Sequence, residues 1–264
     1  MLAVRHLCLM LAVAFGGIFA VPAAQAAPQQ EAAAQLEALL KAHPELILSI
    51  LRDHSEELLD IVQEGSEKRR RLTLKAQWEL DMEKPKNVDI SGRPMGGAAD
   101  APVTVVAYSD FLCSYCHKAA FTIGNLMKRY PGKVRFVFKQ TPNTKIGREA
   151  GCWFLAAHKI DKAKAWKMYA LTFDRQKEVE EASTKTLRAI AKEVGFDAAL
   201  LETAVKAQTP EFEAMMDADA AEASRLGFVG TPYFLVNDLI VRGALPLENF
   251  SEAVEMALSQ KAGK

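Results

Sequence analysis

The stretch Phe111-Leu-Cys-Ser-Tyr-Cys-His-Lys118 decides how this chain is expected to fold. Directly before it, Val103-Thr-Val-Val-Ala-Tyr-Ser109 is a short apolar, β-branched run that is typical of a buried strand. Residues 110–116 predict the turn into a helix that runs to about Tyr130, and Val134-Arg-Phe-Val-Phe-Lys139 predicts the next strand. The sequence therefore predicts a βαβ unit with parallel strands, in which two cysteines lie between a strand and the N-terminus of a helix.

The rest of the C-terminal part alternates between helical and strand patterns. Residues 145–227 have a helical pattern that is interrupted at Gly195-Phe-Asp197. Tyr233–Val236 and Leu239–Arg242 then predict a hairpin, and the residues from Leu247 to Ser259 predict a closing helix. The predicted order is βαβ, a helical insertion, then ββα, which is an α/β fold.

The first residues indicate export. Residues 1–26 begin with Arg5 and His6, continue through an apolar run and end in Ala24-Gln-Ala26, a pattern typical of signal peptidase cleavage. The apolar run is shorter than the ~20 residues that a membrane-spanning helix needs. We interpret residues 1–26 as a cleavable signal peptide, with which Cys8 is lost, and we expect the mature protein in the periplasm.

Residues 27–83 predict a separate helical region. Pro44 divides a first helix, from Glu31 to Ala42, from a second that begins at Glu45. Along this second helix, residues three and four positions apart form one continuous stripe that is mostly apolar. Its members are Ile47, Leu51, His54, Leu58 and Ile61. Either the stripe folds back on the rest of the chain or it packs on another subunit, and we expect the second, a homo-oligomer.

Residues 84–102 differ in composition from both neighbouring regions. They contain several prolines and glycines, among them Pro85, Gly92, Pro94 and Gly97, and few apolar side chains. This composition predicts a linker, so that residues 103–264 would form the catalytic domain.

Charge and cysteine content limit the possible functions. The chain of 264 residues has 33 basic and 33 acidic residues, which gives no general electrostatic reason to expect a nucleic acid partner. Of its 4 cysteines, Cys113, Cys116 and Cys152 remain after signal cleavage. Three cysteines in so long a chain are not a disulfide framework, so the close pair suggests catalysis.

The pair Cys113 and Cys116 is suited to redox chemistry. A helix N-terminus presents unpaired N–H groups and the positive end of the helix dipole, and both stabilise a thiolate. First cysteines of such pairs have pKa values of roughly 3.5 to 7.5. We therefore predict that Cys113 is the nucleophile and that Cys116, one helical turn deeper, is the resolving thiol. A redox-active disulfide between them would need no further cofactor.

The same residues admit other interpretations. Cys113-Ser-Tyr-Cys-His117 matches the attachment sequence of c-type haem, although the strand before it and the helix after it favour a thioredoxin-like unit. A zinc site has less support, because no second close pair of Cys or His residues supplies four ligands, and we predict no metal. Ser114, Tyr115 and His117 are expected to modulate the active pair.

Two further positions complete the candidate site. In Gly230-Thr-Pro-Tyr-Phe234, a proline begins a strand, and cis peptide bonds in folded proteins are almost confined to such X–Pro bonds. Cys152 lies in an apolar helical stretch, which predicts a small buried hydrophobic residue rather than a third redox centre.

Together these residues resemble the DsbA family of bacterial disulfide oxidoreductases, from about Ala98 to Ala262. The resemblance implies a thioredoxin fold with a helical insertion, a catalytic pair Cys113 and Cys116, and a cis-proline loop, Thr231-Pro232, that binds the substrate strand through backbone hydrogen bonds. It also implies unfolded or misfolded exported proteins as substrates, and a membrane partner that reoxidises or reduces the pair.

The helical region resembles the extensions of DsbA-like proteins of the Com1 and ScsC type, some of which oligomerise through it. Two features depart from the DsbA pattern: Ser114-Tyr115 replaces Pro-His, and Thr231 replaces Val. Both are similar to the dimeric isomerase DsbC. The sequence therefore leaves open whether the exchange forms, isomerises or reduces disulfides, and it keeps two alternative functions, a c-type haem electron-transfer protein and a non-enzymatic periplasmic holdase.

Overall fold

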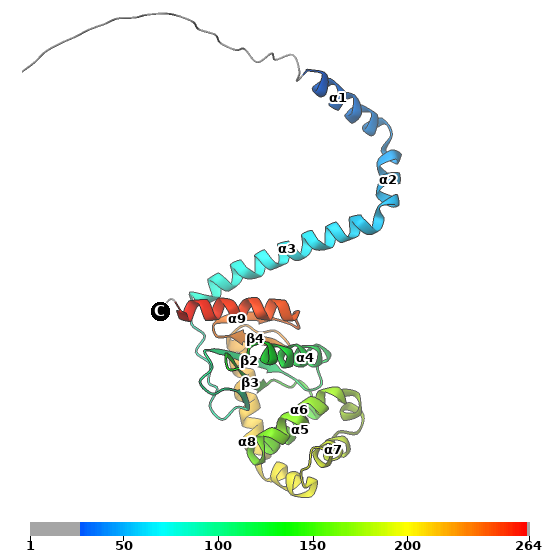
Figure 1. Ribbon diagram of the computed structural model, residues 1–264. Coiled ribbons are helices and arrows are strands. Elements are labelled where there is room, and N and C mark those ends of the chain that lie inside the picture. The colour runs from blue at the N-terminus through cyan, green and yellow to red at the C-terminus, as the bar shows by residue number, and fades with distance from the viewer. Residues whose placement is uncertain (1–26, 263–264) are drawn as a thin grey trace, which may run out of the picture. The chain divides into compact units, whose positions relative to one another are not determined.

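The computed structural model describes residues 27–262, which divide into two compact units, residues 27–67 and the residues from Lys68 onward (Figure 1). The predicted signal peptide lies outside the described residues. The first unit contains α1 (Ala27–Ala42), α2 (Pro44–Asp53) and the first part of α3 (Ser55–Met82). No helix within residues 27–262 is long and apolar enough to cross a membrane.

The stripe of the helical region is divided between two helices, so the prediction of one continuous helix was wrong. The helix α2 ends at Asp53, and α3 begins at Ser55. Charges at the helix ends favour this break. A carboxylate is unfavourable near a helix C-terminus, where Asp53 lies, and favourable in a first turn, where Glu56 and Glu57 lie. All five stripe residues remain exposed within residues 27–262.

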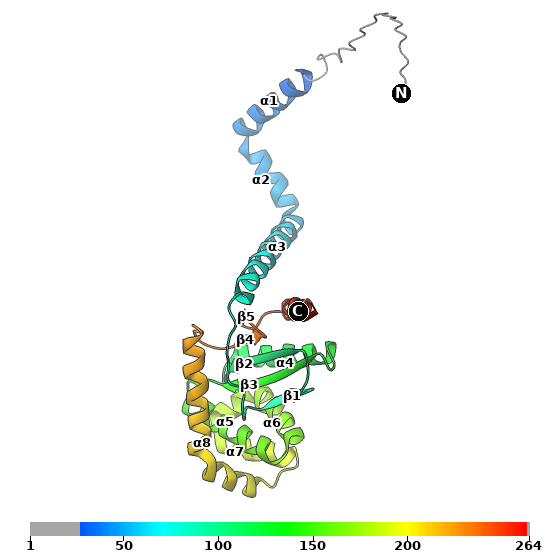
Figure 2. The ribbon, with the colours of Figure 1, turned by 90° about the vertical axis from the view of Figure 1, so that its left-hand side faces the viewer.

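The second unit is built on a five-stranded sheet with the strand order β1-β3-β2-β4-β5 (Figures 1 and 2). Its strands are β1 (Met95–Gly97), β2 (Val103–Ser109), β3 (Val134–Gln140), β4 (Tyr233–Val236) and β5 (Leu239–Arg242). Strands β2 and β3 are parallel and are joined by α4 (Ser114–Arg129), whereas β4 pairs antiparallel with both β2 and β5. The predicted βαβ unit and hairpin are confirmed.

Side chains of the central strands alternate between two apolar clusters. Val105 and Ala107 of β2 face the larger cluster, which includes residues of α4, of the insertion and of the closing helix α9 (Leu247–Ala262). Val106 and Tyr108 face the smaller one, which includes the end of α8. Because successive side chains of a strand point to opposite faces, both faces of the sheet are buried, as a parallel strand pair requires.

The helical insertion has the predicted position. Its helices are α5 (Lys145–Ile160), α6 (Lys162–Asp174), α7 (Gln176–Glu193) and α8 (Ala198–Arg225). Side-chain caps lie at the N-termini of three of them. Thr144 caps α5 by accepting a hydrogen bond from the Gly147 N–H at 3.0 Å, and Asp161 and Asp197 cap α6 and α8.

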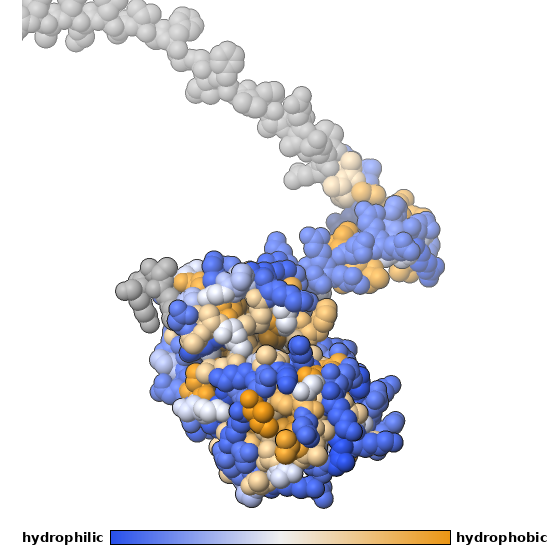
Figure 3. Space-filling view, turned by 60° about the horizontal axis from the view of Figure 1, so that its bottom comes forward, coloured by the Kyte–Doolittle hydropathy of each residue, from blue (hydrophilic) through white to orange (hydrophobic). Residues whose placement is uncertain are grey.

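Apolar side chains are also present on the surface of the second unit, among hydrophilic ones (Figure 3).

The segment 84–102, which we predicted to be a linker, belongs to the sheet unit. Its strand β1 pairs antiparallel with β3, and the Asp89 N–H donates to Glu222 at 3.0 Å. The glycines here serve close packing rather than flexibility. Gly97 has a φ of +87°, and a Cβ at this position would lie 2.6 Å from the Val134 carbonyl oxygen. Composition alone could not separate these two uses of glycine.

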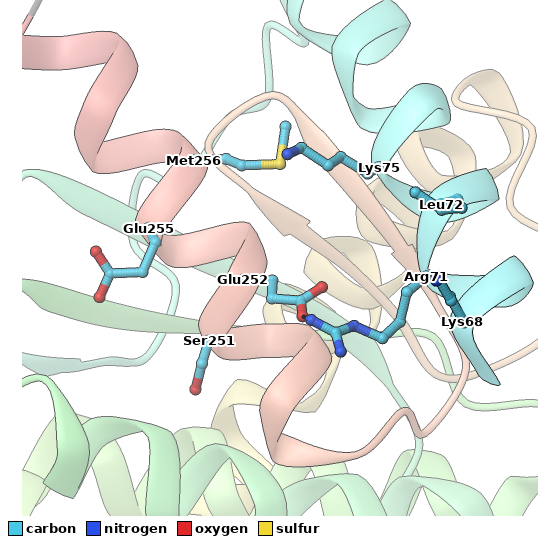
Figure 4. A pocket seen from close by; sticks show the side chains of 8 residues that line it. All are labelled: Lys68, Arg71, Leu72, Lys75, Ser251, Glu252, Glu255 and Met256. Carbon is cyan, nitrogen blue, oxygen red and sulfur yellow. Dashed lines mark ion pairs between the residues drawn. The ribbon is translucent and has the colours of Figure 1, made fainter. Parts of the chain in front are cut away.

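The C-terminal part of α3 also belongs to the second unit. Trp78 is fully buried, and its Nε1 donates to the Ile240 carbonyl at 2.9 Å, while the Ile240 N–H donates to Asp81 at 3.1 Å. These bonds cover the open edge of β5, whose backbone groups would otherwise be unpaired. Nearer the start of this part, Arg71 forms an ion pair with Glu252 across a groove of about 600 Å³ between α3 and α9 (Figure 4).

Candidate active site

Cys113 lies where the turn after β2 enters α4. It is the N-cap residue of α4, with an extended backbone, and its Sγ accepts a hydrogen bond from the Cys116 N–H at 3.3 Å. Its own N–H donates to the Asp110 carbonyl at 3.2 Å. Negative charge on this sulfur is favoured by the helix dipole and the free N–H groups. Because α4 begins at Ser114, Cys116 is already helical and is not part of the predicted turn.

The two thiols have opposite environments. Cys113 is half-buried, and hydrogen bonds lower its pKa to about 6, first of all the bond with the Cys116 side chain, against the opposing effect of burial. Cys116 is 1% exposed, and burial raises the pKa of its thiol far above the ordinary value. The hydrogen bond with Cys113 raises it further. At neutral pH, Cys113 is therefore an accessible thiolate and Cys116 a buried neutral thiol.

The loop that contains Thr231 and Pro232 faces Cys113. Its Thr231–Pro232 peptide bond is cis, as the resemblance implied. The Cys113 thiol, when protonated, donates to the Thr231 carbonyl at 3.5 Å. Pro232 is buried, and its carbonyl accepts a hydrogen bond from the Gly243 N–H at 3.0 Å, whereas Gly230 is exposed. Residues 113 and 231, which are distant in the sequence, thus meet at one partly exposed place.

The other predicted site residues lie around Cys113. Ser114 and Tyr115 are exposed, Tyr115 at 61%, and the Lys118 Nζ lies 5.4 Å from the centroid of the Tyr115 ring. The His117 Nε2 lies 3.4 Å from the Asp174 Oδ1 of α6. His117 therefore connects the active-site helix with the insertion, a contact that the sequence did not predict.

Two residues that we did not single out support the active-site turn. The buried Asp110 carboxylate accepts hydrogen bonds from the Leu112 N–H at 2.9 Å and from the Asn143 N–H at 3.2 Å, and burial raises its pKa. Gln176 of α7 donates to the Phe111 carbonyl at 2.6 Å. The Asp110–Leu112 bond is an Asx turn, which aspartate favours and which the sequence could have indicated. The role of Gln176 has no local signal.

A buried charge network lies on the opposite face of the sheet. It consists of Arg93, Tyr108, Lys139, Asp219 and Glu222. The Tyr108 hydroxyl donates to Glu222 at 2.6 Å, and Lys139 pairs with both acidic residues. Burial opposes ionisation of Glu222, yet the hydrogen bonds from Lys139 and Tyr108 keep its pKa below the ordinary value. Since α8 ends at Arg225, this network fixes the helix end that leads into the Thr231–Pro232 loop.

The third cysteine, Cys152, lies outside the candidate site. It belongs to α5 and is buried in the larger apolar cluster, and burial raises its pKa to about 11. The prediction that it is a buried residue is confirmed.

A haem attached through Cys113 and Cys116 would need both sulfur atoms at one surface, which the burial of Cys116 does not allow. Within residues 27–262, no three His, Cys, Asp or Glu side chains form a group that could hold a metal ion.

Comparison with known proteins identifies the family. A family model described as thioredoxin matches residues 89–256. The chain belongs to the thioredoxin family. Within this family it is 25% identical over 185 residues to disulfide bond formation protein D of Bacillus subtilis, which covers 65% of this chain and 80% of that protein.

The chain is also similar to part of a larger protein. A Na⁺/H⁺ antiporter NhaA of Salinispora tropica is 31% identical over 164 residues, which cover 62% of this chain. The chain spans about a quarter of the length of this antiporter, 24%. The similarity therefore concerns only one part of this larger protein.

Two solved structures are similar in fold to most of this chain. The thiol-disulfide exchange protein alpha-DsbA2 of Wolbachia pipientis has a TM-score of 0.59 at 21% identity, over 71% of this chain and 97% of that chain. ScsC of Proteus mirabilis, in a transitional conformation, has a TM-score of 0.56 at 20% identity, over 89% of this chain and 99% of that one. The predicted resemblance to proteins of the DsbA and ScsC type and the predicted thioredoxin fold are confirmed.

Proposed function

We propose that this protein is a thiol:disulfide oxidoreductase that acts on exported proteins, with Cys113 as the nucleophile and Cys116 as the resolving thiol. One observation carries the proposal: the accessible thiol at the N-terminus of α4 has a pKa of about 6, and its buried neighbour has a raised pKa. The relatives named for disulfide bond formation and for thiol-disulfide exchange support it.

In the reducing direction, the Cys113 thiolate attacks one sulfur of a substrate disulfide. The substrate S–S bond breaks, one substrate sulfur leaves as a thiolate, and a mixed disulfide forms with Cys113. Cys116 then loses its proton and attacks the Cys113 sulfur, so that the second substrate thiolate leaves and two electrons have passed to the substrate. Disulfide formation is the reverse sequence, and isomerisation returns Cys113 to the thiolate without net electron transfer.

Thr231 and Pro232 are proposed to hold the substrate strand beside Cys113. Backbone hydrogen bonds at the exposed loop edge would bind many sequences, because they do not depend on substrate side chains. Ser114, Tyr115 and His117 complete the surface that a substrate meets. We place this activity in the periplasm, after removal of residues 1–26, with a membrane redox partner that restores the active state of the pair and with no nucleic acid partner.

The direction of exchange is tested by the redox equilibrium with glutathione. A lowered Cys113 pKa stabilises the dithiol, and each tenfold change in this equilibrium is worth about 30 mV. We therefore expect the pair to be more oxidising than glutathione. Equilibration in glutathione buffers, followed by alkylation and mass spectrometry, measures the fraction oxidised. A pair that stays oxidised in strongly reducing buffers would contradict this expectation and would indicate a reductant.

We also propose that residues 27–83 hold the subunits of a homo-oligomer together. The exposed stripe on α2 and α3 supports this, since packing it on a second copy removes apolar surface from water. We expect the triple variant Ile47→Ser, Leu51→Ser and Leu58→Ser to have the mass of one chain by light scattering, and the wild type a multiple. Leu200→Ser, an exposed leucine of α8, is the matched control and should keep the wild-type mass. A wild-type mass of one chain would refute the oligomer.

The same stripe favours one second function, a holdase that covers unfolded chains. Aggregation of a client protein separates the two activities, because a holdase needs no thiol. Suppression of aggregation that persists in Cys113→Ser and disappears in the triple stripe variant would support it. Equal suppression of aggregation by the wild type, Cys113→Ser and the triple stripe variant would exclude a role for the stripe.

A further inference from the structure

A trough lies along α4, between α4 and α6. It has a volume of about 530 Å³ and begins at His117, the residue directly after Cys116. Its apolar lining comprises Ala120, Phe121 and Gly124 of α4 and Tyr169, Ala170 and Phe173 of α6. Phe121 is 73% exposed, although a ring of this size is usually buried. The trough is thus a largely apolar surface that begins at His117, one of the candidate site residues.

Gly124 adds no side chain to the wall of the trough. It lies inside α4, where glycine is less favourable than alanine. No atom lies within 4 Å of the Cβ that another residue would add there, and its φ is not positive, so neither packing nor backbone conformation requires glycine. A side chain at this position would project beside Phe121 into the trough. The absence of a side chain at Gly124 leaves this part of the trough open.

The rim of the trough is basic. Lys118 lies at the end near His117 and Lys128 at the far end. The lining has one acidic residue, Asp174, whose Oδ1 lies 3.4 Å from the His117 Nε2. This charge pattern complements an acidic occupant. From His117 to Lys128 the trough follows α4 for about 16 Å, which an extended segment of about five residues would span.

We propose that the trough binds an arm of the polypeptide that exchanges with Cys113, an extended segment of about five residues with apolar side chains and a carboxylate. The inference rests on the proposed exchange activity and adds a substrate preference to it. The Thr231–Pro232 loop would hold the backbone next to the reacting sulfur, and the trough would select among the side chains farther along the same chain.

Two synthetic peptides test this preference. Each contains one cysteine in a mixed disulfide with glutathione; one has five-residue arms of Leu, Phe and Asp on both sides, and the other has arms of Gly and Ser. We expect the reduced full-length protein to react about tenfold faster with the first peptide, from burial of one or two apolar side chains. In Gly124→Leu, the ratio of the two rates should fall to about one. Thr122→Leu adds the same side chain to α4 outside the trough and should keep the wild-type ratio.

Charge reversal supplies a second test that does not depend on filling the trough. In Lys128→Glu, a third peptide, in which Lys replaces Asp in the apolar arms, should react faster than the Asp peptide. Lys128 lies about 22 Å along the helix from its N-terminus, so this change does not act through the Cys113 thiolate. Equal rates for the arm-bearing and Gly-Ser peptides, or a ratio that survives Gly124→Leu, would overturn the trough proposal. Absence of exchange with all peptides would overturn the proposed function, and the trough proposal with it.

Discussion

Replacement of Cys113 by serine is expected to reduce thiol–disulfide exchange to the uncatalysed rate, whereas replacement of Cys116 by serine is expected to trap substrates. We propose Cys113 as the thiolate that a substrate reaches, because its pKa is lowered and it is only half-buried, whereas a serine hydroxyl stays protonated at neutral pH. In Cys116→Ser, the mixed disulfide at Cys113 still forms, but no second thiol of the pair displaces the substrate. Reduction of insulin measures the first effect, and mass spectrometry of the covalent adduct measures the second.

Cys152→Ser is the matched control for both variants. Cys152 is buried and has a pKa of about 11, so we expect exchange at the wild-type rate and no adduct. Loss of activity in Cys152→Ser together with full activity in Cys113→Ser would show that Cys152, and not Cys113, carries the chemistry. An adduct of equal yield in Cys116→Ser and in the wild type would remove the resolving role of Cys116.

The strands next to the cysteine pair could be predicted from the sequence because local pattern and tertiary position agree there. Val103–Ser109 is buried on both faces, so its continuous apolar run has one structural interpretation. The hairpin Tyr233–Val236 and Leu239–Arg242 was equally clear, since Asn237-Asp238 provides a turn between two apolar runs. In both cases the residues that decide the structure are neighbours in the chain.

The features that were not predicted depend on partners far along the chain. Strand β1 has only three residues, two of them glycine, and exists because β3 pairs with it. Trp78 was assigned to a separate helical region, yet it is buried against β5, more than 150 residues later. Lys139 likewise pairs with Glu222, 83 residues later in the chain. Phe121 and Gly124 line a trough whose other wall is α6. Periodicity within one helix does not reveal what lies opposite it.

The candidate site divides in the same way. The positions of Cys113 and Cys116 follow from the strand and helix that enclose them, and the sequence placed both. Their difference in pKa depends on burial and on hydrogen bonds from elements that come together only in the fold. Asp110 and Gln176 hold the turn through contacts with the loop before α5 and with the Phe111 carbonyl. The chemistry could thus be predicted, but its tuning could not.

The titration of Cys113 is the second large effect that we expect. With a pKa of about 6, about nine-tenths of Cys113 is thiolate at pH 7 and about one-tenth at pH 5, whereas an ordinary cysteine with a pKa of about 8.5 would be only a few per cent ionised at pH 7. The rate of attack by the reduced protein should therefore rise about tenfold from pH 5 to pH 7 and then level off. Thiolate absorbance at 240 nm, with the oxidised protein as the blank, measures the midpoint.

The same shift makes the stability of the reduced protein depend on pH. Because the folded-state pKa of Cys113 is lowered, its ionisation stabilises the fold fully above about pH 8.5, and this contribution is lost as the pH falls through about 6. The disulfide form has no ionisable Cys113, so the change with pH in the difference in stability between the two forms reports this contribution. Urea unfolding of both forms at pH 5 and pH 8.5 measures it.

Two variants identify the groups that lower the Cys113 pKa. Cys116→Ala removes the hydrogen bond that contributes most. Thr231→Val removes the Thr231 hydroxyl, whose hydrogen bond contributes less, and keeps the backbone carbonyl that lies 3.5 Å from the Cys113 sulfur. Both midpoints should therefore rise, with the larger rise in Cys116→Ala. Cys152→Ser should leave the midpoint near 6, since the Cys152 thiol stays protonated over this range. A wild-type midpoint near 8.5 would contradict the assignment of Cys113 as an activated nucleophile. An unchanged midpoint in Cys116→Ala would instead assign the lowered pKa to the N-terminus of α4, where the Cys116 and Tyr115 N–H groups bond to the same sulfur.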